Sequence, residues 1–180
     1  MSQLRISVEW IVVMFVSFVA GALGLFIYVL PSNKPPPEKK LIENFYAHRA
    51  AYERIRDMLQ EDRQLLRVAS SGVETTNSVG IRKPPEGGLS VNRYNEYLAL
   101  LRETGAKSGF RSMGERSECA GVLLWGGGWG GGNTRHVGLY WMDYKPNNQV
   151  GSLDVYYRNP ARPRGVFRQI DGSWYLYADW

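Results

Sequence analysis

An uninterrupted apolar run near the amino terminus constrains this chain more than any other feature of its sequence. Residues 10–30 read WIVVMFVSFVAGALGLFIYVL and contain no charged side chain. At about 1.5 Å per residue, a helix of this length spans a hydrocarbon core about 30 Å thick. Trp10 and Tyr28 stand near its ends, where aromatic rings favour the lipid headgroups. The run predicts a transmembrane helix over residues 10–30 in contact with the lipid bilayer, after a short tail of residues 1–9.

A cleaved signal peptide is the alternative interpretation of the same run. The small residues Ala20, Gly21 and Ala22 resemble a cleavage site that follows an apolar stretch. The apolar run continues beyond Ala22, however, and the residues before it are only weakly basic. We therefore favour an uncleaved, single-pass anchor.

Two opposing arguments bear on the orientation of the anchor. Lys34, Lys39 and Lys40 follow the run whereas Arg5 precedes it, and this difference favours a cytoplasmic position for the domain that follows. The short tail, the Pro-rich spacer and a domain rich in Tyr and Trp are, by analogy, typical of anchored envelope proteins. We expect a protein of the cell inner membrane with its C-terminal domain in the periplasm.

The rest of the chain divides into a linker and one domain. Residues 31–40, PSNKPPPEKK, favour extended polyproline conformations and predict a semi-rigid linker. Residues 41–180 are enough for a single folded domain and too few for two independent cores.

Cys119 is the only cysteine, which excludes an intrachain disulfide. The net charge of +5 is small and gives no indication of a nucleic-acid partner.

Two helices are predicted in the first half of the domain. Residues 70–88, rich in Gly, Ser, Thr and Pro, predict a long exposed loop between them. The second helix starts near Ser90, which caps its first turn, and ends at Gly105. The first helix runs from about Glu38 to Ala69, because apolar side chains recur at spacings of three and four. These side chains are Leu41, Phe45, His48, Tyr52, Ile55 and Leu59.

From Lys107 onward the apolar pattern changes to a period of two, which predicts strands. Helices followed by strands predict an α+β fold class. The expected order is the N-terminal transmembrane helix and then two helices packed on an antiparallel β-meander sheet. The glycine-rich residues 126–135 predict a hairpin loop and not a phosphate-binding loop, because a strand follows them. Asp171-Gly172 predicts a tight hairpin turn. The predicted strands are residues 109–113, 119–125, 137–144, 151–157, 165–170 and 174–177.

The alternation also assigns side chains to the two faces of the sheet. The opposite face from the helices is the candidate binding surface. We expect two rows beneath the helices: Val137, Leu139 and Trp141 in one strand, and Leu153, Val155 and Tyr157 in another. The opposite face then carries His136, Tyr140, Ser152, Asp154 and Tyr156.

The candidate binding residues combine aromatic and basic side chains. Tyr140 and Tyr156 belong to the predicted open face of the sheet. Arg158, Arg162 and Arg164 lie in a Pro-containing segment just after it, where they would face an acidic partner or lipid headgroups.

One enzymatic alternative uses Cys119 and His136. The segments ECAG, residues 118–121, and RHVGLY, residues 135–140, resemble the Cys and His motifs of cysteine peptidases that trim cell-wall peptides. Such catalysis needs a thiolate activated by a nearby imidazole. In that family the cysteine opens a helix and the histidine follows much later, whereas here a glycine-rich segment separates them. The two His and one Cys match no recurring zinc spacing, so we expect no metal and no cofactor.

Several segments resemble a group of small uncharacterised bacterial proteins, many of them lipoproteins or single-pass envelope proteins. The resemblance rests on FYAHRAAYERIRDMLQED, RYNEYLALLRETG, VGSLDVYYR and the ending FRQIDGSWYLYADW. It implies a shared fold and a surface location but carries no activity. We expect a non-enzymatic binding domain, of the inhibitor or immunity type or a component of an envelope complex, with an unknown protein or envelope partner. The alternative is a cell-wall peptide hydrolase that uses Cys119 and His136.

Overall fold

The computed structural model describes residues 10, 13–21, 34–114, 117–127, 135–159 and 163–179. The chain divides into two units, Met1–Lys34 and Pro35–Trp180. In the first unit, residues 13–21 are helical. Within the residues that the structure describes, no helix has the length and apolar character needed to cross a membrane. Residues 11–12 and 22–30 of the predicted transmembrane run lie outside the described residues, so that helix stays a prediction.

The second unit is an α+β fold built on one seven-stranded sheet, which confirms the predicted fold class in its coarse form. Each pairing between neighbouring strands is antiparallel, and the spatial order is β2-β1-β3-β4-β5-β7-β6. The strands are β1 (Leu65–Ala69), β2 (Gly72–Thr75), β3 (Ser108–Gly114), β4 (Ser117–Gly127), β5 (Arg135–Met142), β6 (Val166–Asp171) and β7 (Trp174–Asp179). The helices are α2 (Glu38–Ala47), α3 (Arg49–Glu61), α4 (Val91–Thr104) and α5 (Leu153–Arg158).

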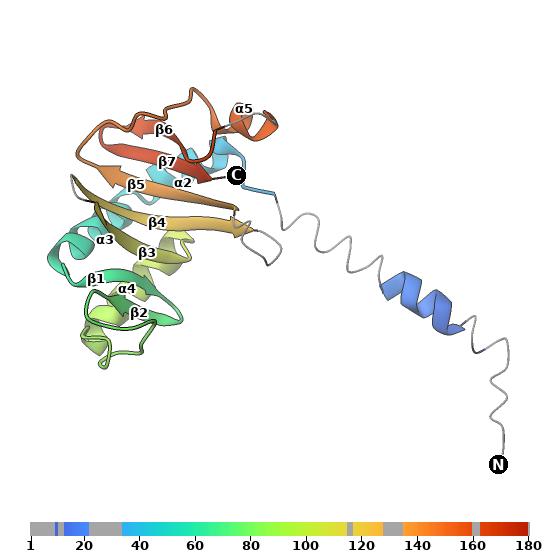
Figure 1. Cartoon of the computed structure of the whole chain (residues 1–180), viewed down its shortest axis with the longest axis horizontal. Coiled ribbons are helices and arrows are strands. Elements are labelled where there is room, and N and C mark those ends of the chain that lie inside the picture. The colour runs from blue at the N-terminus through green and yellow to red at the C-terminus, as the bar shows by residue number, and fades with distance from the viewer. Residues whose placement is uncertain are drawn as a thin grey trace, which may run out of the picture. The chain divides into compact units, whose positions relative to one another are not determined.

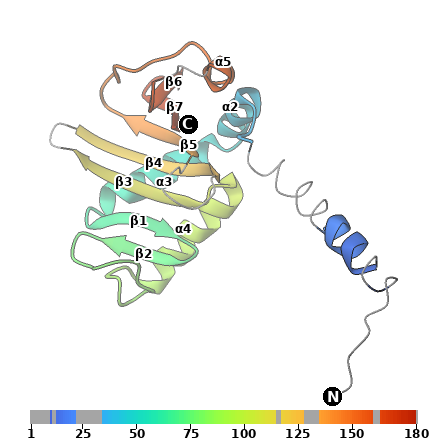
Figure 2. The same cartoon turned by 45° about the vertical axis from the view of Figure 1, so that its right-hand side comes forward.

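Helices α2, α3 and α4 cover one face of the sheet (Figure 1, Figure 2). The core lies between this face and the helices, where Ile55 of α3 and Leu176 of β7 belong to one buried cluster. The predicted row Val137, Leu139 and Trp141 is confirmed on this side. Val137 and Leu139 are fully buried in the cluster, and Trp141 packs against it while partly exposed. Alternation along β5 therefore sends the residues between them to the opposite face.

The predicted helix over residues 38–69 is wrong in two respects. The chain leaves the helical conformation at His48, where φ is −121° and ψ is 25°, so α2 and α3 are separate helices. Helix α3 ends where the next positions of the apolar stripe hold the charged Asp62 and Arg63. Residues 65–69 form β1 instead, which pairs with β2 on one side and β3 on the other.

The predicted loop over residues 70–88 contains β2 and is therefore also partly wrong. Gly72 begins β2 with φ at +140°, a conformation that suits glycine, and lets the chain turn back along β1. Val73 is fully buried and exchanges two backbone hydrogen bonds of 2.8 Å with Arg82. A strand of four residues offers too short an alternating pattern to stand out from the polar residues around it.

The predicted second helix is confirmed as α4, and its local signals explain why. The Ser90 side chain accepts a hydrogen bond from the Arg93 N–H at 3.2 Å, as expected for an N-cap. Gly105 follows the helix with φ at 69°, in the left-handed conformation that ends helices.

Most of the predicted strands are confirmed, and one is wrong. The segments predicted at 109–113, 119–125, 137–144, 165–170 and 174–177 correspond to β3, β4, β5, β6 and β7. Residues 151–157 instead contain α5, in which Leu153 and Tyr156 are buried while Val155 is 67% exposed. A short apolar run fits both periods, so periodicity alone does not decide between a strand and a helix here. The meander is incomplete as well, because β7 pairs with β5 and leaves β6 at the edge.

Candidate functional site

The structure does not bring Cys119 and His136 together. On the paired strands β4 and β5, Cys119 lies opposite Met142, whereas His136 lies opposite Gly126. At about 3.4 Å per residue, this register separates the two side chains by about 20 Å along the strands. A direct hydrogen bond between thiol and imidazole therefore does not form.

The environment of Cys119 also differs from that of a nucleophile. The residue is only 8% exposed and packs in a cluster with Met142 and Tyr175. Burial raises the pKa of the Cys119 thiol to about 12, and the Asp143 carboxylate contributes in the same direction. The thiol is therefore protonated at neutral pH, and a protonated thiol is a poor nucleophile.

The face of the sheet opposite α2, α3 and α4 carries a row of aromatic rings that we call the aromatic face. It crosses β3, β5, β7 and β6, because residues paired across antiparallel strands point to the same side. Phe110 and Tyr140 lie opposite Gly121 of β4, and Tyr140 in turn lies opposite Tyr175 of β7. The aromatic face consists of Phe110, His136, Tyr140, Phe167, Tyr175 and Tyr177.

The rings of the aromatic face form a continuous series of contacts across the strands. The centroid of Tyr140 lies 4.9 Å from that of Phe110 and 5.0 Å from that of Tyr177. Tyr177 lies 4.9 Å from Phe167 and 5.2 Å from the His136 imidazole. Edge-to-face and tilted contacts at these distances are favourable, so the rings hold one another in place. The result is a preorganised surface and not a set of independent side chains.

Two glycines leave room for these rings. A Cβ atom at Gly121 would lie 2.8 Å from Phe110 Cζ, and one at Gly138 would lie 2.8 Å from Tyr140 Cε2. The rings therefore lie directly on the backbone of the neighbouring residues. Glycine within a strand commonly marks such close approach.

Most of the aromatic face is only partly buried, which makes it available for contact. Phe110, His136, Tyr140, Phe167 and Tyr177 are partly exposed, and Tyr175 is buried. Burial raises the pKa of the Tyr140 and Tyr177 phenols above their ordinary value. Both phenols therefore stay neutral and keep a hydroxyl donor. The surface combines apolar rings with hydroxyl groups, as protein contact surfaces commonly do.

The other predicted binding residues are not among the rings of the aromatic face. Tyr156 belongs to α5, is buried, and donates a hydrogen bond of 2.7 Å from its hydroxyl to the Pro163 carbonyl. Arg158 and Arg164 are exposed. Arg162 lies outside the described residues. Sequence reasoning places Tyr140 and His136 on this face correctly. It places Ser152, Asp154 and Tyr156 there wrongly, because they belong to α5 or precede it. It misses Phe110, Phe167, Tyr175 and Tyr177, for which strand alternation is the available signal.

A second site of interest joins the start of α2 to the start of α5. The Glu38 carboxylate accepts hydrogen bonds from Ser152 Oγ at 2.7 Å, from the Leu153 N–H at 2.6 Å and from Arg168 Nε at 3.2 Å. Burial alone raises the pKa of Glu38, but these hydrogen bonds outweigh it and hold the pKa below its ordinary value. An open hollow of about 350 Å³ adjoins this cluster and is lined by Glu38, Lys39, Ile42, Glu43, Ser152 and Asp154.

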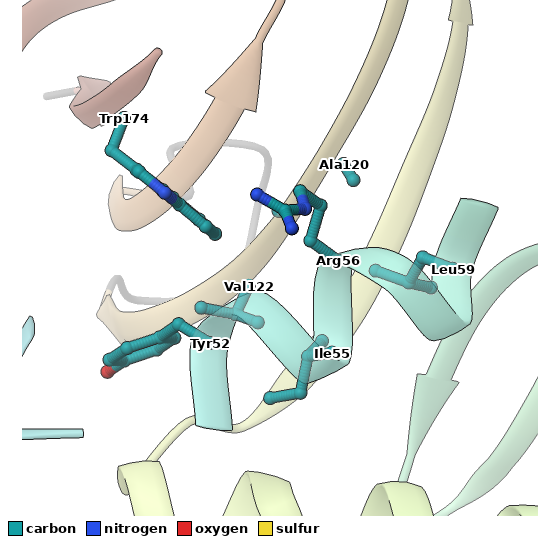
Figure 3. A pocket seen from close by; sticks show the side chains of 8 residues that line it. Tyr52, Ile55, Arg56, Leu59, Ala120, Val122 and Trp174 are labelled. Atoms are coloured by element: carbon teal, nitrogen blue, oxygen red, sulfur yellow. The ribbon is translucent and has the colours of Figure 1, made fainter. Parts of the chain in front are cut away.

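A small cavity lies between α3 and the sheet. Tyr52 and Ile55 of α3 face Val122 and Trp174 across it, and Arg56 lies beside it (Figure 3). Its volume is about 10 Å³, which is about the space for one water molecule. It is therefore a packing defect and not a ligand site.

Within the described ranges, no group of three or more His, Cys, Asp or Glu side chains is placed to hold a metal ion.

Comparison with known proteins adds no assignment: no family model, no curated protein and no solved structure matches the chain. The resemblance drawn from the segments between residues 41 and 180 therefore stays an expectation.

Proposed function

We propose that this chain is a non-enzymatic binding protein whose aromatic face contacts a partner protein. The observation that carries the proposal is the aromatic face itself, with five partly exposed rings, among them Tyr140, Phe167 and Tyr177, fixed by mutual contacts. Tyr and Phe are enriched in the centres of protein interfaces, where they bury a large area at a low cost in conformational entropy. Rings that are already fixed lose less freedom on binding.

The edges of the sheet are less suited to a partner than its face. A strand added to a sheet edge needs free backbone groups. On β2, the backbone groups of Val73 already pair with Arg82. On β6, the Phe167 N–H donates to the Asn148 carbonyl, and the Phe167 carbonyl accepts from the Val150 N–H, each at 2.8 Å. These contacts support docking on the face over strand addition.

The location of the domain is part of the proposal. We infer that residues 10–30 form a transmembrane anchor in the inner membrane and that the domain lies in the periplasm, attached through the linker of residues 31–40. The support is the uncharged run of residues 10–30 and its length. The partner would then be a protein of the envelope, for which the chain acts as an inhibitor, an immunity-type protein or a subunit of a complex. The separation of Cys119 and His136 gives the hydrolase alternative no support.

Site-specific photo-crosslinking in the native membrane tests the binding surface. A photoreactive residue in place of Phe167 or Tyr177 should give a discrete adduct with one protein. The same residue in place of Val91, which is exposed on α4, serves as the control and should give none. Equal adducts at all three positions, or none at the two aromatic positions, would contradict the assignment of the surface.

Two further measurements separate the parts of the proposal. A reporter active only outside the cytoplasm, fused after Trp180, should be active. If this reporter is inactive and a cytoplasmic reporter fused at the same position is active, the periplasmic location is overturned. The assignment of the binding surface is not affected by that result. Cleavage of a cell-wall peptide by the full chain, abolished by Cys119→Ala, would overturn the non-enzymatic assignment.

A further inference from the structure

Helices α2 and α5 cap each other, although they are far apart in sequence. Glu38 is the first residue of α2, and its N–H donates to Asp154 Oδ1 in the first turn of α5 at 3.1 Å. In return, the Glu38 carboxylate accepts from the Leu153 N–H, the first N–H of α5, at 2.6 Å. Each helix therefore supplies the carboxylate that satisfies a free N–H at the start of the other.

Helix α5 depends strongly on this contact. It has six residues, too few for a helix to be stable by itself in water. Ser152 precedes it but makes no side-chain cap, and the Ser152 hydroxyl donates to Glu38 instead. Leu153 and Tyr156 are the buried side chains of α5, whereas Val155 is largely exposed. Contacts with the rest of the domain therefore stabilise α5: its buried side chains pack in the core, and Glu38 caps its first turn.

Glu38 is also held firmly at its own position. It is only 9% exposed, and Arg168 of β6 forms an ion pair with it at 3.2 Å. Pro37, the residue before it, ends the proline run that enters the domain, and its carbonyl accepts from the Lys40 N–H at 3.0 Å. The Glu38 carboxylate is therefore held in the first turn of α2, directly after the proline run.

We propose that Glu38 is a latch that couples the start of α2 to α5. Helix α5 stays docked while the first turn of α2 is formed, and it is released when that turn opens. Arg158, the last residue of α5, is exposed, so release of α5 changes the position of this cation. The latch does not depend on the aromatic face or on the identity of its partner.

Hydrogen exchange followed by mass spectrometry on the full chain tests the latch. In Glu38→Ala, the amides of residues 153–158 should exchange about tenfold faster or more, because loss of a charged cap weakens a helix start by that order. The amides of α4 should keep their protection. Glu43→Ala is the matched control, since Glu43 lies on the same helix and pairs only weakly with Lys39 at 3.8 Å. It should leave α5 unchanged.

Two other variants test the coupling in both directions. Asp154→Asn should speed exchange at Glu38 and in the first turn of α2. Lys40→Gly should weaken the first turn of α2, because glycine is a poor helix former and Lys40 is exposed, and it should also speed exchange in α5. If Glu38→Ala does not fold, Glu38→Gln takes its place. Unchanged exchange in α5 in the Glu38 and Lys40 variants, or equal acceleration in α4, would overturn the latch.

Discussion

The ring of Phe110 lies directly on Gly121 of the neighbouring strand, where a Cβ atom would be 2.8 Å from Phe110 Cζ. Tyr140 lies opposite the same glycine from the other side, and the two rings are 4.9 Å apart. The two rings therefore contact each other above the backbone of Gly121. An absent side chain is what makes this part of the surface possible.

Gly121→Ala should therefore destabilise the fold by about 1–3 kcal/mol, as overpacking commonly does. The added methyl would also lie 2.8 Å from the Leu139 carbonyl oxygen, which belongs to the backbone and moves with difficulty. Chemical denaturation measures the change. Gly151→Ala is the control and should have a small effect, because a methyl added there would meet no atom within 4 Å beyond its chain neighbours. Equal stability of the two variants would contradict the close contact.

Glu38 should make stability depend on pH in the acid range. Its folded-state pKa lies below the ordinary value of 4.5, so its contribution is present above that value and is lost as pH falls through the folded-state pKa. Glu38→Gln should cost about 1–3 kcal/mol at pH 7, since hydrogen bonds to a charged group are lost. The difference from the wild type should shrink in acid. A difference that stays constant between pH 7 and pH 3 would contradict the assignment.

Val122→Ile should stabilise the fold by about 0.5–1 kcal/mol, because one methylene enters the cavity beneath α3 (Figure 3). Val137→Ile is the matched control. Val137 is fully buried and does not line that cavity, so the same added methylene should be neutral or destabilising there. Thermal unfolding of both variants gives the comparison, and a more stable Val137→Ile variant would contradict it.

Cys119 should react slowly with an alkylating reagent at pH 8 in the folded chain and rapidly after denaturation. Its thiol is buried, and a pKa of about 12 leaves little thiolate. Mass spectrometry over time measures the labelling. Rapid labelling of the folded chain would show that Cys119 is accessible and would reopen its role as a nucleophile.

The elements that sequence predicts well here are those whose determinants are local. Helix α4 has its N-cap at Ser90 and its terminating glycine at Gly105 within its own segment. Strands β5 and β7 alternate over several residues. The hairpin predicted at Asp171-Gly172 joins β6 to β7, although its turn lies one residue later, at Gly172 and Ser173. These signals need no knowledge of the rest of the fold.

The elements that sequence misses depend on distant contacts. The sequence of helix α5 resembles a strand because its apolar pattern is short. It also lacks a local helix-start signal, because its cap, Glu38, lies 115 residues away from Leu153. The aromatic face can be predicted only in part, since Phe110 and Phe167 join Tyr140 through strand pairings that no local pattern specifies. The same strand register separates Cys119 from His136, although the residue types alone fit a catalytic pair.

The two outermost strands of the sheet have one more consequence. Val73 on β2 and Phe167 on β6 each use their backbone groups on a neighbouring loop of the same chain. An open edge would allow copies of the domain to join into a growing sheet, which is a common route to aggregation. Both edges are interrupted in this way, which shortens the free stretch of each edge strand and lowers the tendency of copies of the domain to join edge to edge.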